Sequence, residues 1–305
     1  MTTKQSPDRS GATTHSRHEA KTSMPDLRLL PVESLVLHEH ADPKRVARLE
    51  ERLRTDGFLK SPPIVAPISG SDRYVVLDGA NRTSAVRRIG CPHLLVQVVD
   101  YSSDQVELTT WHHLITGRSP ETFLDDIRSV KGLAATPSPL RDSRKQLDER
   151  SILSYVVIPA SDEMDEATVY TVAASSNKPT RDATALLNAM VDTYKGDPQV
   201  SIHRVNTDNL EELMSLYDNV SGLVVFPPYR PQDIMRLAEE GQFVPTGITR
   251  HIISHRALRV NVPMSLLCGE GTLDEKNNWW HEQIKRKLAL NQIRLYQEST
   301  YLFDE

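Results

Sequence analysis

The stretch YVVLDGANRTSAVRRIG, residues 74–90, changes character at Asp78-Gly79. The β-branched and aromatic residues before that pair predict a strand, and those after it are typical of a helix that ends at Gly90. A strand that leads directly into a helix exposes the first backbone N–H groups of the helix at the end of a sheet, where they attract anions. The stretch therefore predicts either a phosphate site or an ordinary capped turn.

Both interpretations use the same residues. For a phosphate site, Gly79 lets the backbone approach a ligand closely, Arg82 adds a charged fork and Asp78 holds Mg²⁺ against the phosphates. For a plain turn, Asp78 caps the helix and Gly79 makes the bend. Junctions of this kind are common, so the spacing alone does not decide between a nucleotide cradle and a turn.

The segments around this stretch predict a small α/β unit in which strands alternate with helices. Between Asp42-Pro43, a typical helix start, and Gly57, a typical stop, apolar residues recur at helical spacing. The predicted strands lie in LRLLPVESLVLHEH (27–40, a short strand with a turn), SPPIVAPI (61–68) and LLVQVVDY (94–101).

The rest of the chain predicts a second, larger α/β unit. We interpret VELTTWHHLITG (106–117) as a helix, and residues 132–150, rich in Pro, Ser and charge, as a linker or mobile loop. Beyond Ser151 we expect strands over 154–159, 168–174, 200–205 and 222–227 and helices over 180–195, 208–219, 230–241 and 277–296. The fold class is α/β (α+β), divided into a disordered tail over 1–26, an N-terminal domain over 27–118, a linker or mobile loop over 119–150 and a C-terminal domain over 151–305.

Composition narrows the class of protein. The chain has 305 residues, of which 38% are hydrophobic, and a formal net charge of -5. This balance provides no global basic field, so nucleic acid is not an expected partner. No apolar run reaches transmembrane length and the N-terminus lacks the apolar region of a secretory signal. We therefore expect a cytoplasmic protein with no membrane partner.

The chain has two cysteines, Cys91 and Cys268. They lie far apart in the sequence, and no CxxC or Cys/His spacing of a zinc site surrounds them. We therefore expect neither a disulfide framework nor a structural metal, which suits a reducing compartment.

Three further features are candidates for chemistry. Glu39 follows a strand and precedes a helix, where loops often carry function, although a lone glutamate there is usually solvated or capping. The segment PTGITRHIISHRALRVNVP (245–263) combines Arg250 and His251 with a glycine, a mixture suited to binding carboxylate or phosphate, or else a solvated basic helix face. Trp111 is either a core residue or a platform for a ligand.

Taken in order, these motifs and FPPYRPQDIMRLAEEGQFVPTGITRHIISHRALRVNVP (226–263) resemble the free L-serine kinases of the ParB/sulfiredoxin-like fold, including those of siderophore clusters. The similarity covers most of residues 27–265, and its strongest marker is GITRHII..RALRVN.P. It implies a small ParB/sulfiredoxin-like nucleotide-binding domain and a larger α/β domain that completes the serine site. The implied reaction transfers the terminal phosphate of ATP or ADP to the hydroxyl of free L-serine, giving O-phospho-L-serine for siderophore or antibiotic biosynthesis.

The resemblance also implies a role for each matching residue. Glu39 corresponds to the general base, and Asp78 to the aspartate near Mg²⁺ and the phosphates, with Glu39 reaching the metal directly or through water. Ala80 and Asn81 depart from the family, which has two histidines there, and Asn81 cannot supply a charged imidazole. The implied nucleotide-binding residues are Gly79, Ala80, Asn81, Arg82 and Thr83, and the implied serine-binding residues are Trp111, Thr249, Arg250 and His251.

Sister activities of the fold leave alternatives open. ParB proteins have a Gly-Glu-Arg-Arg loop where this chain has GANR, so a nucleotide-sensing DNA-binding regulator is the second candidate. The Ala80-Asn81 departure motivates a third, a degenerate kinase that binds nucleotide or serine without turnover. Sulfiredoxin-like repair is disfavoured because Ala80 takes the place of the cysteine. The sequence has no motif that distinguishes ATP from ADP as the phosphate donor, and none that indicates the oligomeric state. Haem binding through a His or Cys is a minor alternative.

Overall fold

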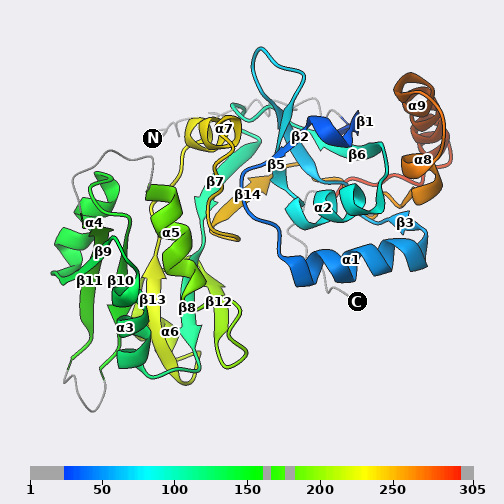
Figure 1. Ribbon diagram of the computed structural model, residues 1–305. Helices are drawn as coiled ribbons and strands as arrows, with labels where there is room; N and C mark the ends of the chain where they lie inside the picture. Colours follow the sequence, from blue (N-terminus) through cyan, green and yellow to red (C-terminus); the bar gives the residue numbers. More distant parts are fainter. Residues whose placement is uncertain (1–23, 161–165, 176–182, 297–305) are drawn as a thin grey trace, which may run out of the picture.

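The computed structural model describes residues 24–160, 166–175 and 183–296, and it shows a mixed α/β protein with two large sheets set side by side (Figure 1). Nearly all of the tail predicted over 1–26 lies outside the described residues. Within the described ranges, none of the helices has the length and apolar character needed to cross a membrane.

The first sheet has five strands in the order β1-β6-β4-β5-β2. The predicted strands are confirmed as β1 (Asp26–Pro31), β4 (Ile64–Pro67), β5 (Tyr74–Asp78) and β6 (His93–Val98). After β1, where one short strand with a turn was expected, the chain forms a 3-10 turn, η1 (Val32–Ser34), and a second strand, β2 (Leu35–Leu37). The predicted helices are α1 (Pro43–Asp56) and α2 (Ala80–Ile89). Asp42 caps α1 by accepting two backbone N–H groups, and Gly57 ends it at a φ of 73°.

The second sheet has six strands in the order β12-β8-β13-β10-β11-β9. They are β8 (His112–Thr116), β9 (Leu133–Pro137), β10 (Ser154–Ile158), β11 (Thr168–Ala174), β12 (Ser201–Val205) and β13 (Val220–Val225). The helices of this half are α3 (Pro120–Ser129), α4 (Leu140–Asp148), α5 (Ala183–Asp192), α6 (Leu210–Met214) and α7 (Pro231–Glu239). Buried apolar clusters on the two faces of the sheet form its core.

Two predictions in the middle of the chain are wrong. Residues 106–117 form two strands, β7 (Val106–Thr110) and β8, rather than a helix. The expected linker or mobile loop over 119–150 contains α3, α4 and β9, and β9 pairs with β11 at the edge of the second sheet. β-Branched threonines and pairing partners distant in the sequence override the helix-like spacing and the turn-rich composition there.

The C-terminal part of the chain returns to the first sheet (Figure 1). β14 (Thr249–Ile253) pairs with β7, so the basic-helix interpretation of 245–263 is also wrong. β15 (Val262–Pro263) pairs with β3 (Phe58–Leu59), and α8 (Met264–Cys268) and α9 (Leu273–Ala289) follow. Trp280 of α9 belongs to the apolar core of the first sheet. The small N-terminal unit is thus completed by residues from the end of the chain.

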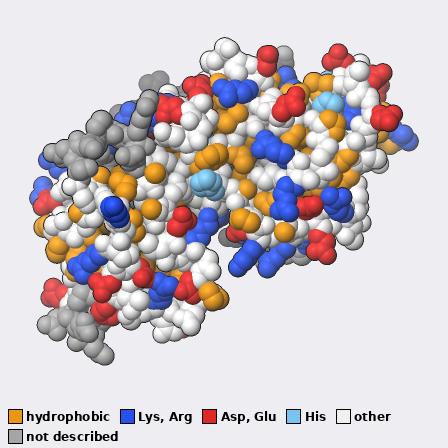
Figure 2. All heavy atoms as spheres, viewed as in Figure 1, with side chains coloured by type: hydrophobic (Ala, Val, Ile, Leu, Met, Phe, Trp, Pro, Cys, Tyr) orange, Lys and Arg blue, Asp and Glu red, His pale blue; other side chains and the backbone are white. Residues whose placement is uncertain are grey.

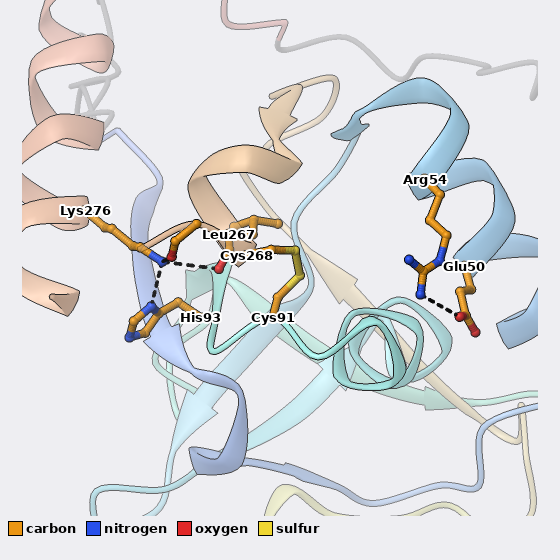
Figure 3. Close-up of a disulfide and its surroundings, with 8 residues drawn as sticks. Glu50, Arg54, Cys91, His93, Leu267, Cys268 and Lys276 are labelled. Atoms are coloured by element: carbon orange, nitrogen blue, oxygen red, sulfur yellow. Dashed lines mark hydrogen bonds and ion pairs between the residues drawn. A yellow bond between two sulfur atoms is a disulfide. The ribbon is translucent and has the colours of Figure 1, made fainter. Parts of the chain in front are cut away.

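Cys91 and Cys268 form a disulfide, contrary to the prediction that the chain has none (Figure 3). The bond joins the loop after α2 to the end of α8, across a sequence separation of 177. Beside it the buried ammonium of Lys276 donates to the carbonyls of Leu267 and Gly269, at 3.4 and 2.7 Å. Distance along the sequence did not reveal this pairing, because α8 folds back on the N-terminal unit.

Candidate active site

Glu39 and Asp78 lie at the same edge of the first sheet. β2 and β5 are parallel neighbours in which Leu37 pairs with Val76, so the chain leaves both strands at one edge. Glu39 lies two residues after Leu37, and Asp78 lies two residues after Val76. Both side chains are partly buried. Because adjacent strands lie about 4.8 Å apart, the sheet brings two carboxylates together from separate segments of the chain.

The loop that carries Glu39 is attached to the loop before β14. Three hydrogen bonds make the attachment: Val244 N–H to the His38 carbonyl (2.9 Å), the Thr246 hydroxyl to the His40 carbonyl (2.8 Å) and Gly247 N–H to Oε2 of Glu39 (2.9 Å). Gly247 has a φ of 78°, and a side chain at this position would collide with the guanidinium of Arg204. The orientation of Glu39 therefore depends on a glycine of the second half of the chain.

His38 is buried and orients Thr249. Nδ1 of His38 lies 2.7 Å from the carbonyl oxygen of Val76, which can only accept, so this nitrogen donates. Nε2 then accepts from the hydroxyl of Thr249 at 3.0 Å. Burial lowers the pKa of His38 although the charge of Glu39 acts in the opposite direction. A neutral histidine thus fixes Thr249 beside the Glu39 loop.

The N-terminus of α2 has no side-chain cap. Gly79 occupies the N-cap position with a φ of 102°, and a Cβ there would lie 2.9 Å from Cβ of Pro63. The simpler interpretation, in which Asp78 caps this helix, is therefore wrong. Asn81 faces the Glu39 loop, where its Oδ1 accepts the N–H of Asp42 at 2.8 Å. The first turn keeps the open N–H groups that an anion requires.

Asp78 contacts two arginines instead. Its Oδ2 accepts from Arg82 at 3.0 Å and from Arg256 of the segment after β14. Arg82 also donates to the carbonyls of Ser61 and Pro62, at 2.9 and 3.3 Å. Burial lowers the pKa of Arg82 to about 10, so this side chain remains charged at neutral pH. Arg82 braces the strand–helix junction, while Arg256 is exposed to solvent.

The residues at this edge suit a metal ion that arrives with a nucleotide. Among the described residues there is no group of three or more carboxylate, His or Cys side chains that could hold a metal alone. Oδ1 of Asp78, however, makes no hydrogen bond to the described part of the chain. Mg²⁺ at nucleotide sites commonly takes one or two carboxylates together with phosphate oxygens and water. Asp78 fits that requirement.

Trp111, Arg250 and His251 do not all face the same way. The guanidinium of Arg250 stacks on Trp111, 4.3 Å above the ring centre. His251 lies on the opposite face of β14, where its Nε2 is 2.8 Å from the Tyr101 hydroxyl. Burial, together with the neighbouring His38, lowers the pKa of His251 to about 3, so its ring is neutral. Arg250 is therefore the cationic member of the pair at neutral pH.

Several residues at this site were not singled out from the sequence. Gly247 and Thr246 hold the Glu39 loop, Tyr101 contacts His251, and Arg204 packs on Gly247. Each of these contacts joins residues far apart in the sequence. The glycine of the PTGITR segment was the one local signal that could have pointed to Gly247.

Several curated relatives match along most of the chain. The ATP-dependent L-serine kinase of Staphylothermus marinus is 26% identical over 239 residues, which are 78% of this chain and 90% of the relative. The ATP-dependent L-serine kinase SbnI of Staphylococcus aureus is 26% identical over 284 residues, 92% of this chain and 97% of the relative. The ADP-dependent L-serine kinase SerK of Thermococcus kodakarensis is 24% identical over 101 residues, 33% of this chain and 42% of the relative. No protein-family model matches the sequence.

A solved structure shows the same fold. A free serine kinase in complex with AMP has a TM-score of 0.68 and 15% identity, and the match covers 82% of this chain and 97% of that one. The fold is therefore that of a free serine kinase. The relatives that match along most of its length make the chain similar to the free L-serine kinases in sequence as well as in fold.

Proposed function

We propose that the protein transfers the terminal phosphate of ATP to the hydroxyl of free L-serine, giving O-phospho-L-serine and ADP. The observation that carries the proposal is the pair Glu39 and Asp78 at one sheet edge, beside the uncapped N-terminus of α2. ATP is preferred to ADP as donor because the three relatives that cover most of the chain are named ATP-dependent.

In this reaction Glu39 is the general base. The serine hydroxyl gives its proton to a Glu39 carboxylate oxygen while its own oxygen forms a bond to the γ-phosphorus. The bond from that phosphorus to the bridging oxygen breaks, and its electron pair leaves with ADP. Oε2 of Glu39 is engaged by Gly247, whereas Oε1 makes no hydrogen bond to the described residues, so we assign proton transfer to Oε1. The hydrogen bond at Oε2 holds the carboxylate in place without consuming the basic oxygen.

The N-terminus of α2 binds the phosphates in our proposal. The backbone of Gly79, Ala80 and Asn81 offers N–H groups at a positive helix end. The partly buried Arg82 holds this turn through the carbonyl of Ser61, and Thr83 is buried beneath it. Asp78 would hold Mg²⁺, with Glu39 reaching it directly or through water. The ion supplies neutralisation of phosphate charge when bound. Asn81 also tethers the Glu39 loop through Asp42, a role that needs no protonated histidine.

The serine side is formed by Trp111 and β14. Thr249 is presented by His38 next to Glu39, and the Arg250–Trp111 stack forms a wall of the pocket. His251 is neutral and acts by positioning Tyr101 and His38 rather than by charge. These assignments retain the residues that the family resemblance implied and give His251 a different role.

We also propose that the two halves are two domains, the first of them ParB/sulfiredoxin-like. The five-stranded sheet with α1 and α2 would bind nucleotide, and the six-stranded sheet would complete the serine site. The boundary lies earlier than 118, because β8 already belongs to the second sheet, and the first domain includes the C-terminal elements from β15 to α9.

Phosphorus NMR tests the proposed function directly. Purified protein is incubated with Mg²⁺, L-serine and either ATP or ADP, and the spectrum is compared with authentic O-phosphoserine. We expect the phosphomonoester with ATP and less or none with ADP. Nucleotide binding without product from either donor would support the degenerate kinase or the ParB-like regulator, and a DNA-binding assay at physiological salt would then separate these two.

A further inference from the structure

Two cations of the second sheet converge on the loop that holds Glu39. Arg204 lies on β12, where it pairs with His113 of β8, and its guanidinium packs against the backbone of Gly247. The ammonium of Lys195, just after α5, donates to the hydroxyl of Thr246 at 3.1 Å. Thr246 and Gly247 both hydrogen-bond to the Glu39 loop, so the two cations and the proposed base meet at one place.

Arg204 and Lys195 have no ion-pair partner in the described part of the chain, although the charge of Glu39 acts on Arg204. None of the ion pairs within the described ranges involves Arg204 or Lys195. Arg204 is exposed, and Lys195 is partly exposed. The surface view shows Lys and Arg side chains on both sides of the notch between the two lobes (Figure 2). Two converging cations without a carboxylate partner favour an anionic ligand.

Electrostatics support a substrate anion rather than a fixed partner. The pKa of Arg204 is lowered, because desolvation outweighs the opposing effect of the nearby Glu39 charge. The two side chains therefore interact electrostatically without forming an ion pair. His113 is buried and its pKa is lowered to about 3 by burial and by the nearby Arg204, His112 and Lys195. This neutral ring adds no competing charge. The available charge at neutral pH is therefore that of Arg204 and Lys195.

We propose that Arg204, assisted by Lys195, binds the carboxylate of L-serine, an inference that rests on the proposed function. The carboxylate and hydroxyl of serine are separated only by Cα and Cβ, so a serine whose hydroxyl reaches Glu39 keeps its carboxylate close to Glu39. Arg204 is a cation whose guanidinium packs on Gly247, the residue that holds Glu39, and its planar fork can make two parallel hydrogen bonds to a carboxylate. It thus determines specificity for free serine over serine within a peptide.

Arg250 is less well placed for this role. Its guanidinium is stacked on Trp111, and strand alternation puts it on the face of β14 opposite to Thr249, which contacts His38. Arg204, in contrast, packs on the residue whose N–H binds Glu39. The two possible carboxylate-binding residues, Arg204 and Arg250, can thus be distinguished with a substrate that lacks the carboxylate.

Serinamide, in which an uncharged amide replaces the carboxylate, tests the assignment. We compare KM for serine and serinamide, and KM for ATP, in wild type, Arg204→Ala, Arg204→Lys and Arg250→Ala. A charged hydrogen bond contributes about 1.5–3 kcal/mol, so Arg204→Ala should raise KM for serine about 10- to 100-fold. KM for serinamide and for ATP should change by less than about threefold, and Arg204→Lys should lie between. Arg128→Ala, which removes an exposed arginine of α3, is the matched control.

The outcomes separate the inference from the proposed function. If Arg204→Ala discriminates between serine and serinamide as well as wild type does, or if only its KM for ATP rises, the carboxylate assignment is wrong. Loss of discrimination in Arg250→Ala alone would overturn it as well. Calorimetric titration of serine and serinamide in the presence of a non-hydrolysable ATP analogue gives the same comparison without turnover. Arg204-dependent serine binding without phosphoserine would retain the inference and reject the kinase activity.

Discussion

The backbone N–H of Gly247 donates a hydrogen bond to Oε2 of Glu39, with 2.9 Å between nitrogen and oxygen. The two residues are 208 positions apart, and they come from the two halves of the molecule. Glu39 is therefore oriented only when both halves are assembled. A proposed base held in this way is preorganised, which favours reaction from the bound geometry.

Glu39→Gln should abolish most turnover while leaving nucleotide binding intact. The amide oxygen can still accept the Gly247 N–H, so the loop keeps its position, but the side chain can no longer take a proton. General-base catalysis contributes about 10²- to 10⁴-fold, and we expect a fall in kcat of that order. Phosphoserine formation and the Kd for ATP are measured on the same preparation. Turnover close to wild type would show that Glu39 is not the base.

Gly247→Ala should impair catalysis more than Gly241→Ala, although both changes strain the backbone to a similar degree. Gly247 has a φ of 78° and its Cβ would collide with Arg204, whereas Gly241 has a φ of 66° and nothing within 4 Å. A left-handed conformation costs an alanine about 1–2 kcal/mol, so both variants should lose similar stability from strain. Only Gly247→Ala should displace Arg204 and Glu39 and lower kcat/KM for serine. Equal activity in the two variants would contradict the proposed arrangement.

Arg250→Ala should raise KM for serine more than it lowers kcat. The change removes the guanidinium that stacks on Trp111 at 4.3 Å and so opens a wall of the proposed pocket. Discrimination between serine and serinamide should survive, because that discrimination is assigned to Arg204. Arg250→Lys keeps the charge but not the planar stack, and it distinguishes a role in packing from a role in charge. An unchanged KM for serine would show that the serine pocket is not formed by β14.

Reduction of the disulfide should destabilise the protein. The Cys91–Cys268 bond closes a long loop, with a sequence separation of 177, and it attaches α8 to the first sheet. Loss of such a bond commonly costs about 2–5 kcal/mol, which we expect as a lower free energy of unfolding in reductant. The variant Cys91→Ser with Cys268→Ser should match the reduced protein and show no response to reductant. A wild type that does not respond to reductant would show that the two thiols are unpaired in solution.

Local signals predicted much of the first sheet and its helices. Asp42 and Gly57 bound α1 as expected, and Gly90 ends α2 at a φ of 87°. Caps of this kind are set by the chemistry of one or two residues, so they can be read without a partner. Glu39 and Asp78 were selected by their places after strands and by a family resemblance, and the sheet brings both to one edge.

Features that depend on distant partners could not be predicted. VELTTWHHLITG forms strands because β7 pairs with β14 and β8 pairs with β12 and β13. The Cys91–Cys268 bond and the approach of Arg204 to Gly247 likewise require the folded chain. Each such contact joins segments whose separation in the sequence carries no signal of their proximity, so tertiary pairing decides them.

The stability of the protein should fall below about pH 6.5 because of buried histidines such as His113. This side chain is 2% exposed, its Nδ1 lies 3.0 Å from the Tyr194 hydroxyl, and burial lowers its pKa to about 3. The unfolded chain therefore binds a proton at a higher pH than the folded one, and stability is lost as pH falls from the unfolded pKa towards the folded value. The slope is at most about 1.4 kcal/mol per pH unit for each such histidine.

Urea unfolding of His113→Asn between pH 7 and 5 checks this expectation. Asparagine keeps a polar partner for Tyr194 but does not titrate, so the free energy of unfolding should depend less steeply on pH than in wild type, whatever its absolute value. His281→Asn, at an exposed position of α9, provides the control for the substitution itself. The range stops at pH 5 because carboxylates begin to protonate below it. Equal slopes in wild type and His113→Asn would mean that His113 takes up its proton in the folded protein as readily as in the unfolded chain.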